Sequence, residues 1–133
     1  MNIISFVGEA NAVVDANGRV SLPSTFRDIL PEGEKKFYLA TGKGSALMLF
    51  RESYYNEVIG PKIMAMSTED RINAAKSAQF VVLDEKQNRF LLPKKFKEHA
   101  KMEKDVVFVG AIDKILIYAS EIYDHSGRFE YDL

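Results

Sequence analysis

Cysteine and tryptophan are absent from this sequence, and only two histidines and four prolines occur among its 133 residues. Without cysteine there can be no disulfide, thiolate nucleophile or cysteine-ligated metal, and the absence agrees with a reducing compartment. Two histidines also fall short of a three-histidine metal set. No apolar run approaches the roughly 18 residues that cross a bilayer, and residues 1–6 lack the basic start and long apolar stretch of a signal peptide. We therefore expect a cytoplasmic protein.

Neither sign of charge dominates, because 18 Lys and Arg oppose 19 Asp and Glu for a formal net charge of −1. The whole chain is thus not a polycation attracted to any phosphate. Basic residues nevertheless gather between residues 86 and 101, where six Lys or Arg and one acid give a local balance of +5, whereas residues 113–133 hold five acids and two bases. The basic segment indicates either a face for an anion or the solvated face of a helix, and charge alone leaves both open.

One stretch, residues 15–27, organises the rest of the sequence. Asn17-Gly18 supplies the positions of positive φ that a two-residue hairpin turn needs, so the strand at Val13-Val14 is expected to reverse there. The next four residues, 19–22, alternate polar and apolar side chains, which predicts a second strand with one face toward a core. Pro23 suits a first helical turn better than a strand ladder, so a short helix should follow.

The same pattern returns about seventy residues later, at residues 85–97. A repeat at this spacing predicts two halves of similar structure, which we place at residues 1–60 and 61–133 as one intertwined unit. In this register Glu85 falls on Asp15, Arg89 on Arg19, Pro93 on Pro23, Phe96 on Phe26, Lys97 on Arg27 and, at a slightly different offset, Gly110 on Gly42 and residues 115–118 on residues 47–50.

Hydrophobic periodicity predicts the other elements and a β-rich α+β fold. Strands are expected at residues 3–14, 36–41, 46–50, 79–83, 105–109 and 114–118. Helices are expected at residues 51–59, ending at Gly60-Pro61, at 67–77 with a Ser67 cap, and at 93–101, with short helical turns at 62–66 and 119–124. From His125 onward no period is clear, which is typical of a frayed tail or of a segment ordered by a neighbouring subunit.

These motifs resemble the MraZ family over residues 6–124. The resemblance is carried by Asp15-x-x-Gly18-Arg19-x-Ser-x-Pro23-x-x-Phe26-Arg27, by its repeat, and by the hairpin that contains Gly110 and Tyr118. MraZ proteins are bacterial transcriptional regulators associated with the division and cell-wall gene cluster, and they belong to the AbrB-like swapped-hairpin superfamily. The resemblance implies two pseudo-symmetric halves interleaved in a swapped-hairpin β-barrel. It also implies a homo-oligomeric ring that binds short repeated promoter elements and is associated with the nucleoid.

The family's Asp-x-x-x-Arg signature falls on Asp15 and Arg19, while the second copy departs from it. There Glu85 stands in register, Asp84 lies one position early, and Asn88 replaces a glycine. Asparagine tolerates the left-handed region best among the other residues, so we expect the turn to survive. In the first copy, Asn17 replaces a lysine of the family and removes one positive charge.

For a DNA-binding role, Arg19 and Arg89 are the main candidates, because a guanidinium can bind guanine or two phosphate oxygens bidentately. An ion pair between each arginine and the acid that precedes it is the alternative, and one arginine can serve in both ways. Further candidates are cations that could contact phosphates or amides that could contact adenine edges, although solvation and turn geometry explain them as well. They are Arg27, Lys86, Lys94, Lys95, Lys97, Asn17 and Gln87.

No catalytic constellation emerges, and we expect a protein that is not an enzyme and needs no cofactor, metal, membrane or small-molecule substrate. The stretch Gly42-Lys-Gly-Ser45 lacks the earlier glycine and the following helix of a phosphate-binding loop. Asp84 and Glu85 do not form a catalytic carboxylate pair, because adjacent residues of a strand point to opposite faces. The alternative to a DNA-binding regulator is a ring-forming interaction module that has lost DNA binding. Whether Arg89 faces outward or is locked inward by an acid should discriminate the two.

Overall fold

The computed structural model describes residues 4–133, so Ile3 of the expected opening strand lies outside the described residues. The first half contains β1 (Glu9–Val13), β2 (Arg19–Ser21), α1 (Ser24–Arg27), β3 (Lys36–Thr41) and β4 (Leu47–Arg51). The second half repeats this order with β5 (Ala78–Val82), β6 (Arg89–Leu91), α5 (Lys94–His99), β7 (Asp105–Gly110) and β8 (Ile115–Ala119). Between them lie α2 (Glu52–Tyr54), the π-helix η1 (Tyr55–Ile59), α3 (Gly60–Met64) and α4 (Thr68–Lys76).

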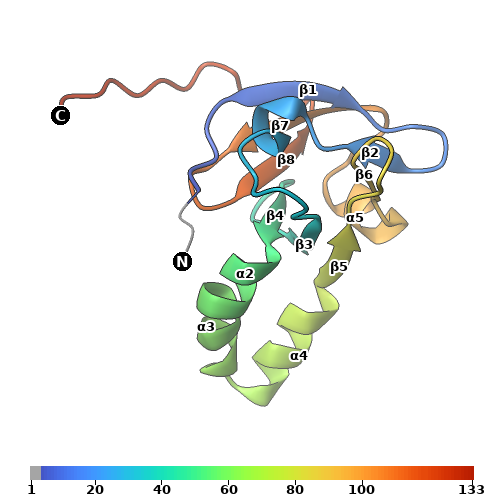
Figure 1. The fold of residues 1–133 in the computed structure, drawn as a ribbon. Helices are drawn as coiled ribbons and strands as arrows, with labels where there is room; N and C mark the ends of the chain where they lie inside the picture. Colours follow the sequence, from blue (N-terminus) through green and yellow to red (C-terminus); the bar gives the residue numbers. More distant parts are fainter. Residues whose placement is uncertain (1–3) are drawn as a thin grey trace.

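The strands form two antiparallel sheets (Figure 1), with the order β1-β7-β8-β4-β3-β5 in one and β2-β6 in the other. The α+β class is confirmed, but the expected closed barrel is not, since the six-stranded sheet keeps two edges, β1 and β5. The expected hairpin of residues 13–22 is also corrected. Its turn forms, with the Gly18 N–H donating to the Asp15 carbonyl at 3.0 Å, yet its two strands pair with different partners from the other half.

The pairing relates the halves by an approximate two-fold symmetry. Strand β1 pairs with β7 as β5 pairs with β3, and β2 pairs with β6 as β4 pairs with β8. The β2–β6 ladder is centred on Val20 and Phe90, and the β4–β8 ladder on Met48 and Leu116, which are equivalent positions of the repeat. Neither half therefore completes its sheets without the other.

The core follows from the alternation of the strands. Val20 and Phe90 point inward from the β2–β6 ribbon, and Phe26 and Phe96 point inward from the helices that follow it. Each is at most 1% exposed, and burying a side chain of this size contributes about 2–3 kcal/mol. Phe6 from the N-terminal segment packs edge-on against Phe26, with ring centroids 6.2 Å apart. This core fixes the ribbon on the body of the molecule.

The segment between the halves projects from the sheets as two helical arms (Figure 1), and none of its helices contains a buried residue. The first arm does not end at Gly60-Pro61 as expected. Pro61 lies in the first turn of α3, where a missing N–H leaves no helical bond unmade, and the π-helix η1 leads directly into that turn. The expected cap of α4 is confirmed, because Ser67 Oγ accepts from the Asp70 N–H at 3.1 Å.

After β8 the chain makes a single turn, in which the Ile122 N–H donates to the Ala119 carbonyl at 3.0 Å. The Tyr123 hydroxyl then donates to Glu9 Oε2 on β1 at 2.6 Å, and this bond raises the pKa of Tyr123 to about 12. Among the helices of residues 4–133, none has the length and apolar character needed to cross a membrane.

Candidate nucleic-acid interface

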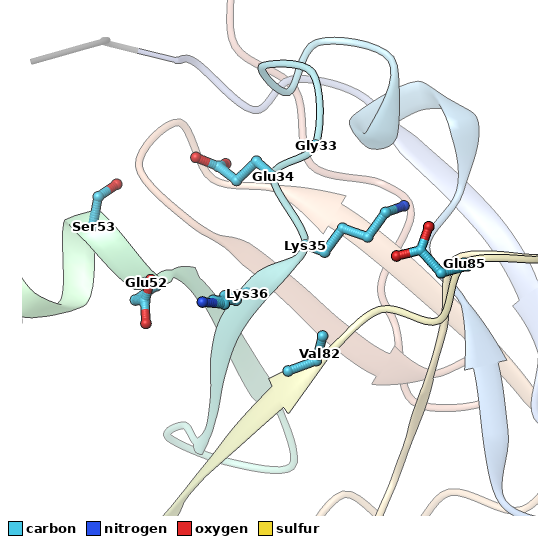
Figure 2. Close-up of a pocket in the computed structure, with 8 residues that line it drawn as sticks. All are labelled: Gly33, Glu34, Lys35, Lys36, Glu52, Ser53, Val82 and Glu85. Atoms are coloured by element: carbon cyan, nitrogen blue, oxygen red, sulfur yellow. The ribbon is translucent and has the colours of Figure 1, made fainter.

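A hollow of about 510 Å³ lies at one end of β3 and β5 (Figure 2). Its lining carries both signs of charge, with Lys35 and Lys36 beside Glu34, Glu52 and Glu85. Glu34 is already engaged, because its two carboxylate oxygens accept from the Arg51 guanidinium at 2.7 Å each. Within residues 4–133 no group of three or more His, Cys, Asp or Glu could hold a metal ion. The turns that lead to Arg19 and Arg89 contain a defined arrangement of hydrogen bonds and ion pairs.

Asp15 closes the first of these turns. Its Oδ1 accepts from the backbone N–H groups of Asn17 and Arg19 at 2.9 Å each, and Gly18 provides the positive φ of 80°. The bond from the Arg19 N–H is the main cause that lowers the pKa of Asp15, with the nearby Arg89 charge acting in the same direction. The carboxylate is thus a structural part of the turn, which delivers Arg19 to the first position of β2.

In the second turn Asp84, not Glu85, has this role. Asp84 Oδ1 accepts from the Gln87 N–H at 2.9 Å and from the Arg89 N–H at 3.2 Å. The register from the sequence is therefore shifted by one, because this loop is one residue longer and Glu85 is exposed within it. Asn88 adopts a positive φ of 53°, in the place that Gly18 takes with 80° in the first turn. Hydrogen bonds, first that from Gln87, lower the pKa of Asp84 to about 2.

The two turns present their arginines on one surface of the β2–β6 ribbon. Arg19 stands opposite Leu91, and Arg89 stands opposite Ser21, while Val20 and Phe90 between them are buried. Because side chains alternate along a strand, these four residues share the outer face. Arg19 and Arg89 are diagonal neighbours, a relation that places residues about 7–8 Å apart. We call Arg19, Ser21, Arg89 and Leu91 the ribbon face.

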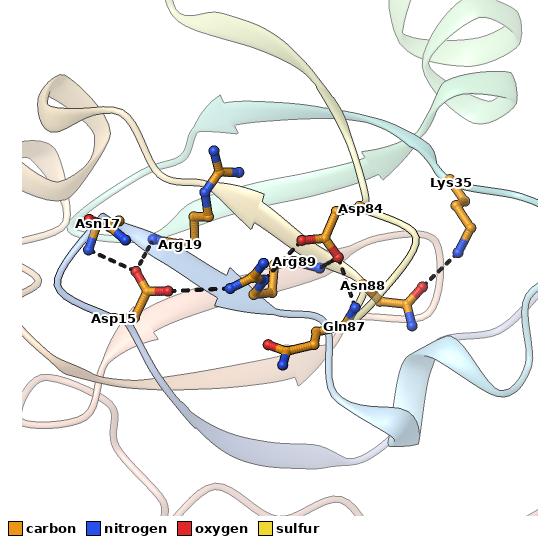
Figure 3. A network of polar contacts seen from close by, with 8 residues as sticks. All are labelled: Asp15, Asn17, Arg19, Lys35, Asp84, Gln87, Asn88 and Arg89. Atoms are coloured by element: carbon orange, nitrogen blue, oxygen red, sulfur yellow. Dashed lines mark hydrogen bonds and ion pairs between the residues drawn. The ribbon is translucent and has the colours of Figure 1, made fainter.

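The two arginines differ in their partners (Figure 3). Arg89 Nε donates to Asp84 Oδ2 at 2.9 Å, and its Nη1 lies 3.9 Å from Asp15 Oδ2, so two acids from different turns hold it. Its side chain keeps 32% of its surface exposed. The Arg19 side chain is exposed, and within residues 4–133 its guanidinium makes no hydrogen bond or ion pair. One guanidinium is thus free for a ligand, and the other is accessible but pre-oriented.

Cations of each half flank the turn of the other half. A methyl group added to Gly18 would lie 3.5 Å from Lys97 Nζ, which places that ammonium beside the first turn. Arg27 Nη1 donates to the Leu22 carbonyl at 3.4 Å, and the Leu22 N–H donates to the Asn88 carbonyl of the second turn. The exchange of strands brings these charges together, although they are far apart in sequence.

Two further lysines at the turns were missed by the sequence analysis. Lys35 Nζ donates to Asn88 Oδ1 at 2.8 Å, and Lys104, whose carbonyl accepts from the Val14 N–H at 2.8 Å, precedes β7 just as Lys35 precedes β3. The sequence could have indicated them only through their equivalent positions, one residue before β3 and one residue before β7. Their nearness to the turns depends on the pairing of β1 with β7 and of β5 with β3, which the sequence did not predict.

The other candidates lie at different places. Lys86 and Gln87 are exposed in the second loop, and Asn17 in the first. Lys94 lies 3.9 Å from Glu98 on exposed helix surface, and Lys95 Nζ donates to the Lys76 carbonyl at 2.9 Å, so neither joins the ribbon face. The motif prolines, Pro23 and Pro93, both have φ of −60° and directly precede α1 and α5.

Comparison with known proteins relates this chain to one family. Residues 74–126 match the family described as "MraZ protein, putative antitoxin-like". Three proteins named "Transcriptional regulator MraZ" match nearly the whole chain. That of Lachnoclostridium phytofermentans is 35% identical over 124 residues, covering 90% of this chain and 84% of the relative. That of Carboxydothermus hydrogenoformans is 34% identical over 127 residues, covering 90% and 85%. That of Thermoanaerobacter sp. (strain X514) is 32% identical over 124 residues, covering 89% and 83%. Identity at this level over this length shows that the chain belongs to the MraZ family.

Proposed function

We propose that the protein is a DNA-binding transcriptional regulator whose ribbon face enters a groove of DNA. A two-stranded antiparallel ribbon fits the major groove, where a guanidinium can bind guanine bidentately. The single observation that carries the proposal is the exposed Arg19 on the same face as Arg89. In this proposal the cations of residues near the turns, Lys35, Lys97, Lys104 and Arg27, contact phosphates on either side of the groove.

Two groove-facing arginines per chain would bind DNA weakly, so the proposal includes a homo-oligomeric ring and repeated elements in the target promoter. Several copies of one patch gain affinity through effective concentration when the DNA offers sites at matching spacing. We infer that the promoter is that of the division and cell-wall cluster, as the family resemblance implies, and that the protein acts at the nucleoid. The exchanged pairing of the two repeats, 1–60 and 61–133, is consistent with the swapped-hairpin arrangement of AbrB-like proteins.

The test is a titration of the protein against the DNA upstream of its own gene at two salt concentrations. Arg19→Ala should lose about 1–3 kcal/mol of binding free energy, roughly 5- to 150-fold in affinity. Arg89→Ala should lose less, because Arg89 must give up part of its pairing with Asp84 to bind. Arg71→Ala on the projecting α4, where the guanidinium donates to Thr68 Oγ1, is the matched control and should bind like the wild type.

An affinity that ignores both salt and the two arginines would contradict this function. The alternative then gains, namely an assembly module that keeps the oligomer without binding DNA. One observation favours it: Arg89 is held by Asp84 and lies close to Asp15, so half of the arginine pair is neutralised within the protein. A protein that forms stable oligomers but shows no salt-dependent binding to DNA would support that alternative.

A further inference from the structure

Strand β5 is an edge of the six-stranded sheet with open backbone groups. At its ends the Thr41 N–H donates to the Ser77 carbonyl at 3.1 Å, and the Leu83 N–H donates to the Lys35 carbonyl at 2.9 Å. Bonded pairs alternate along an antiparallel ladder, so the backbone groups of Ala78, Phe80 and Val82 point away from β3. Within residues 4–133 no other strand pairs with β5 on that side.

The side chains of this edge are uncharged and, apart from Gln79, apolar, as the residues Ala78-Gln-Phe-Val-Val82 show. Phe80 is 42% exposed and Val82 is 51% exposed, and the Phe80 ring lies 5.3 Å from that of Tyr38 on β3. Soluble proteins usually protect an edge strand with charge, proline or a covering segment, and an apolar edge without these is a site for pairing with another strand.

The equivalent edge in the first half, β1, does have such protection. Glu9 places a charge on this edge, and the segment after β8 crosses it through Tyr123 and through His125 Nδ1, which lies 3.3 Å from Glu9 Oε1. Where β5 carries Phe80, the equivalent position of β1 carries Asn11. The apolar character of β5 is therefore not required by the fold, because the same architecture tolerates a polar edge at the related position.

The C-terminal segment has the pattern of a strand without a partner. Phe129-Glu-Tyr-Asp-Leu133 alternates apolar and acidic residues at the strand period. Phe129 and Tyr131 are 78% and 74% exposed, and their rings contact each other in an edge-to-face arrangement with centroids 5.0 Å apart. Figure 1 shows this segment extending away from the sheets.

The surface around this edge also fits an apolar partner. A groove beside β5 is lined by Phe80, Val82 and Leu91, with Arg19 at its side. Because side chains alternate along a strand, a tail that covers Phe80 and Val82 with Phe129 and Tyr131 turns Glu130 and Asp132 to its other face, away from Lys36, which stands opposite Val82. The hollow at the Val82 end (Figure 2) contains Glu52 and Glu85 as well as Lys36, so apolar contact and main-chain pairing, and not charge, favour this tail.

We propose that residues 129–133 of one copy add as a strand to the β5 edge of a second copy. The main-chain groups of Ala78, Phe80 and Val82 would supply the hydrogen bonds, and the apolar side chains of the tail would cover Phe80 and Val82. Each copy donates one tail and accepts one, so the contact is head-to-tail, and repeated contacts of this kind close into a ring when the rotation permits. The inference rests on the self-association in the proposed function, and its test needs no DNA.

The experiment uses two full-length variants and their mixture. The tail variant carries Phe129→Ser and Tyr131→Ser, and the edge variant carries Phe80→Ser and Val82→Ser. The wild type should sediment as an assembly, and each variant alone should sediment as one chain of 15.0 kDa. Mixed one to one, they should form a species of twice that mass, because the intact tail of one can dock on the intact edge of the other. Val13→Ser on β1, at a position 53% exposed, is the matched control and should keep the wild-type mass.

A second measurement does not depend on the edge variant's folding. A synthetic peptide of residues 124–133, added to the tail variant, should slow amide hydrogen exchange at Phe80 and Val82 and leave Val13 unchanged. The inference is overturned if the wild type is monomeric, if the tail variant keeps the wild-type mass, if the two folded variants do not combine, or if the peptide protects neither amide. A failure of DNA binding alone would appear only in the titration and would leave these results unaffected.

Discussion

Gly110 marks a place where two backbones meet without room for a side chain. A Cβ atom added there would lie 2.4 Å from the Phe6 carbonyl oxygen, 2.5 Å from its carbon and 2.7 Å from the Val7 nitrogen. These neighbours are main-chain atoms, which cannot swing aside as the end of a side chain can. Gly110→Ala should therefore push the N-terminal segment off β7.

The cost follows from what that segment would lose. Its contacts with the β7 end and the turn after it include three backbone hydrogen bonds: Gly110 N–H to Gly8, Phe6 N–H to Ile112, and Ile112 N–H to Phe6, at 2.8–3.0 Å. At about 1 kcal/mol each, their loss amounts to about 3 kcal/mol. For a chain of this size such a change lowers Tm by roughly 10 °C.

The chain offers a control in Gly42, a glycine of the first half. The sequence register places Gly42 on Gly110, but the structure corrects this: Thr41 pairs with Leu47 as Gly110 pairs with Ile115, so Thr41 is the structural counterpart of Gly110. A Cβ added there would meet the flexible Met48 side chain at 3.1 Å and one carbonyl, that of Ala46, at 3.3 Å. Gly42→Ala should change stability by less than about 1 kcal/mol, since Met48 can adjust and the alanine restricts the unfolded chain. Urea unfolding followed by far-UV circular dichroism, at one protein concentration, measures both variants. Equal effects at the two glycines would refute the reasoning.

Two further predictions concern ionised groups. Arg51→Met should lower the free energy of unfolding by about 2–4 kcal/mol in urea titrations, because Arg51 is only 7% exposed and its removal leaves the half-buried Glu34 unpaired. Adding Glu34→Leu to this variant should restore part of the lost stability. A double variant no more stable than Arg51→Met would count against the pairing. The Asp84 carboxyl is held ionised in the fold, with its pKa lowered from 3.8 to about 2, so it stabilises the protein above pH 4 and this contribution disappears as the pH falls toward 2. Asp84→Asn should flatten the stability curve in that window, and curves that fall in parallel would contradict the assignment.

The local structure was largely predictable because it depends on interactions between residues close in sequence. Turn residues such as Asn17-Gly18, the prolines that open α1 and α5, and the period of the β-strands all act within a few residues. The repeat then supplied the division into halves, and with it the expectation that Arg19 and Arg89 are related positions. Their common face on one ribbon follows from that relation.

The pairing of the strands was not predictable from the same signals. A turn at Asp15 is compatible with a simple hairpin and with strands that part toward different sheets, and only the whole core decides between them. The shift from Glu85 to Asp84 is a matter of one residue in a loop, where two adjacent acids look equivalent until the bonds of Asp84 to Gln87 and Arg89 are known. The helix through Pro61 depends on the π-helix before it, which has no clear sequence signature.

The β2–β6 ribbon has a consequence for incomplete chains. Its two strands come from opposite halves, so a fragment that stops before residue 89 holds Arg19 on a strand with no neighbour, and a fragment that lacks residues 19–21 leaves Arg89 in the same condition. Products of interrupted synthesis or of cleavage between the halves therefore cannot display the two guanidinium groups side by side. If the pair binds DNA as proposed, only a copy that contains both halves and is folded can do so.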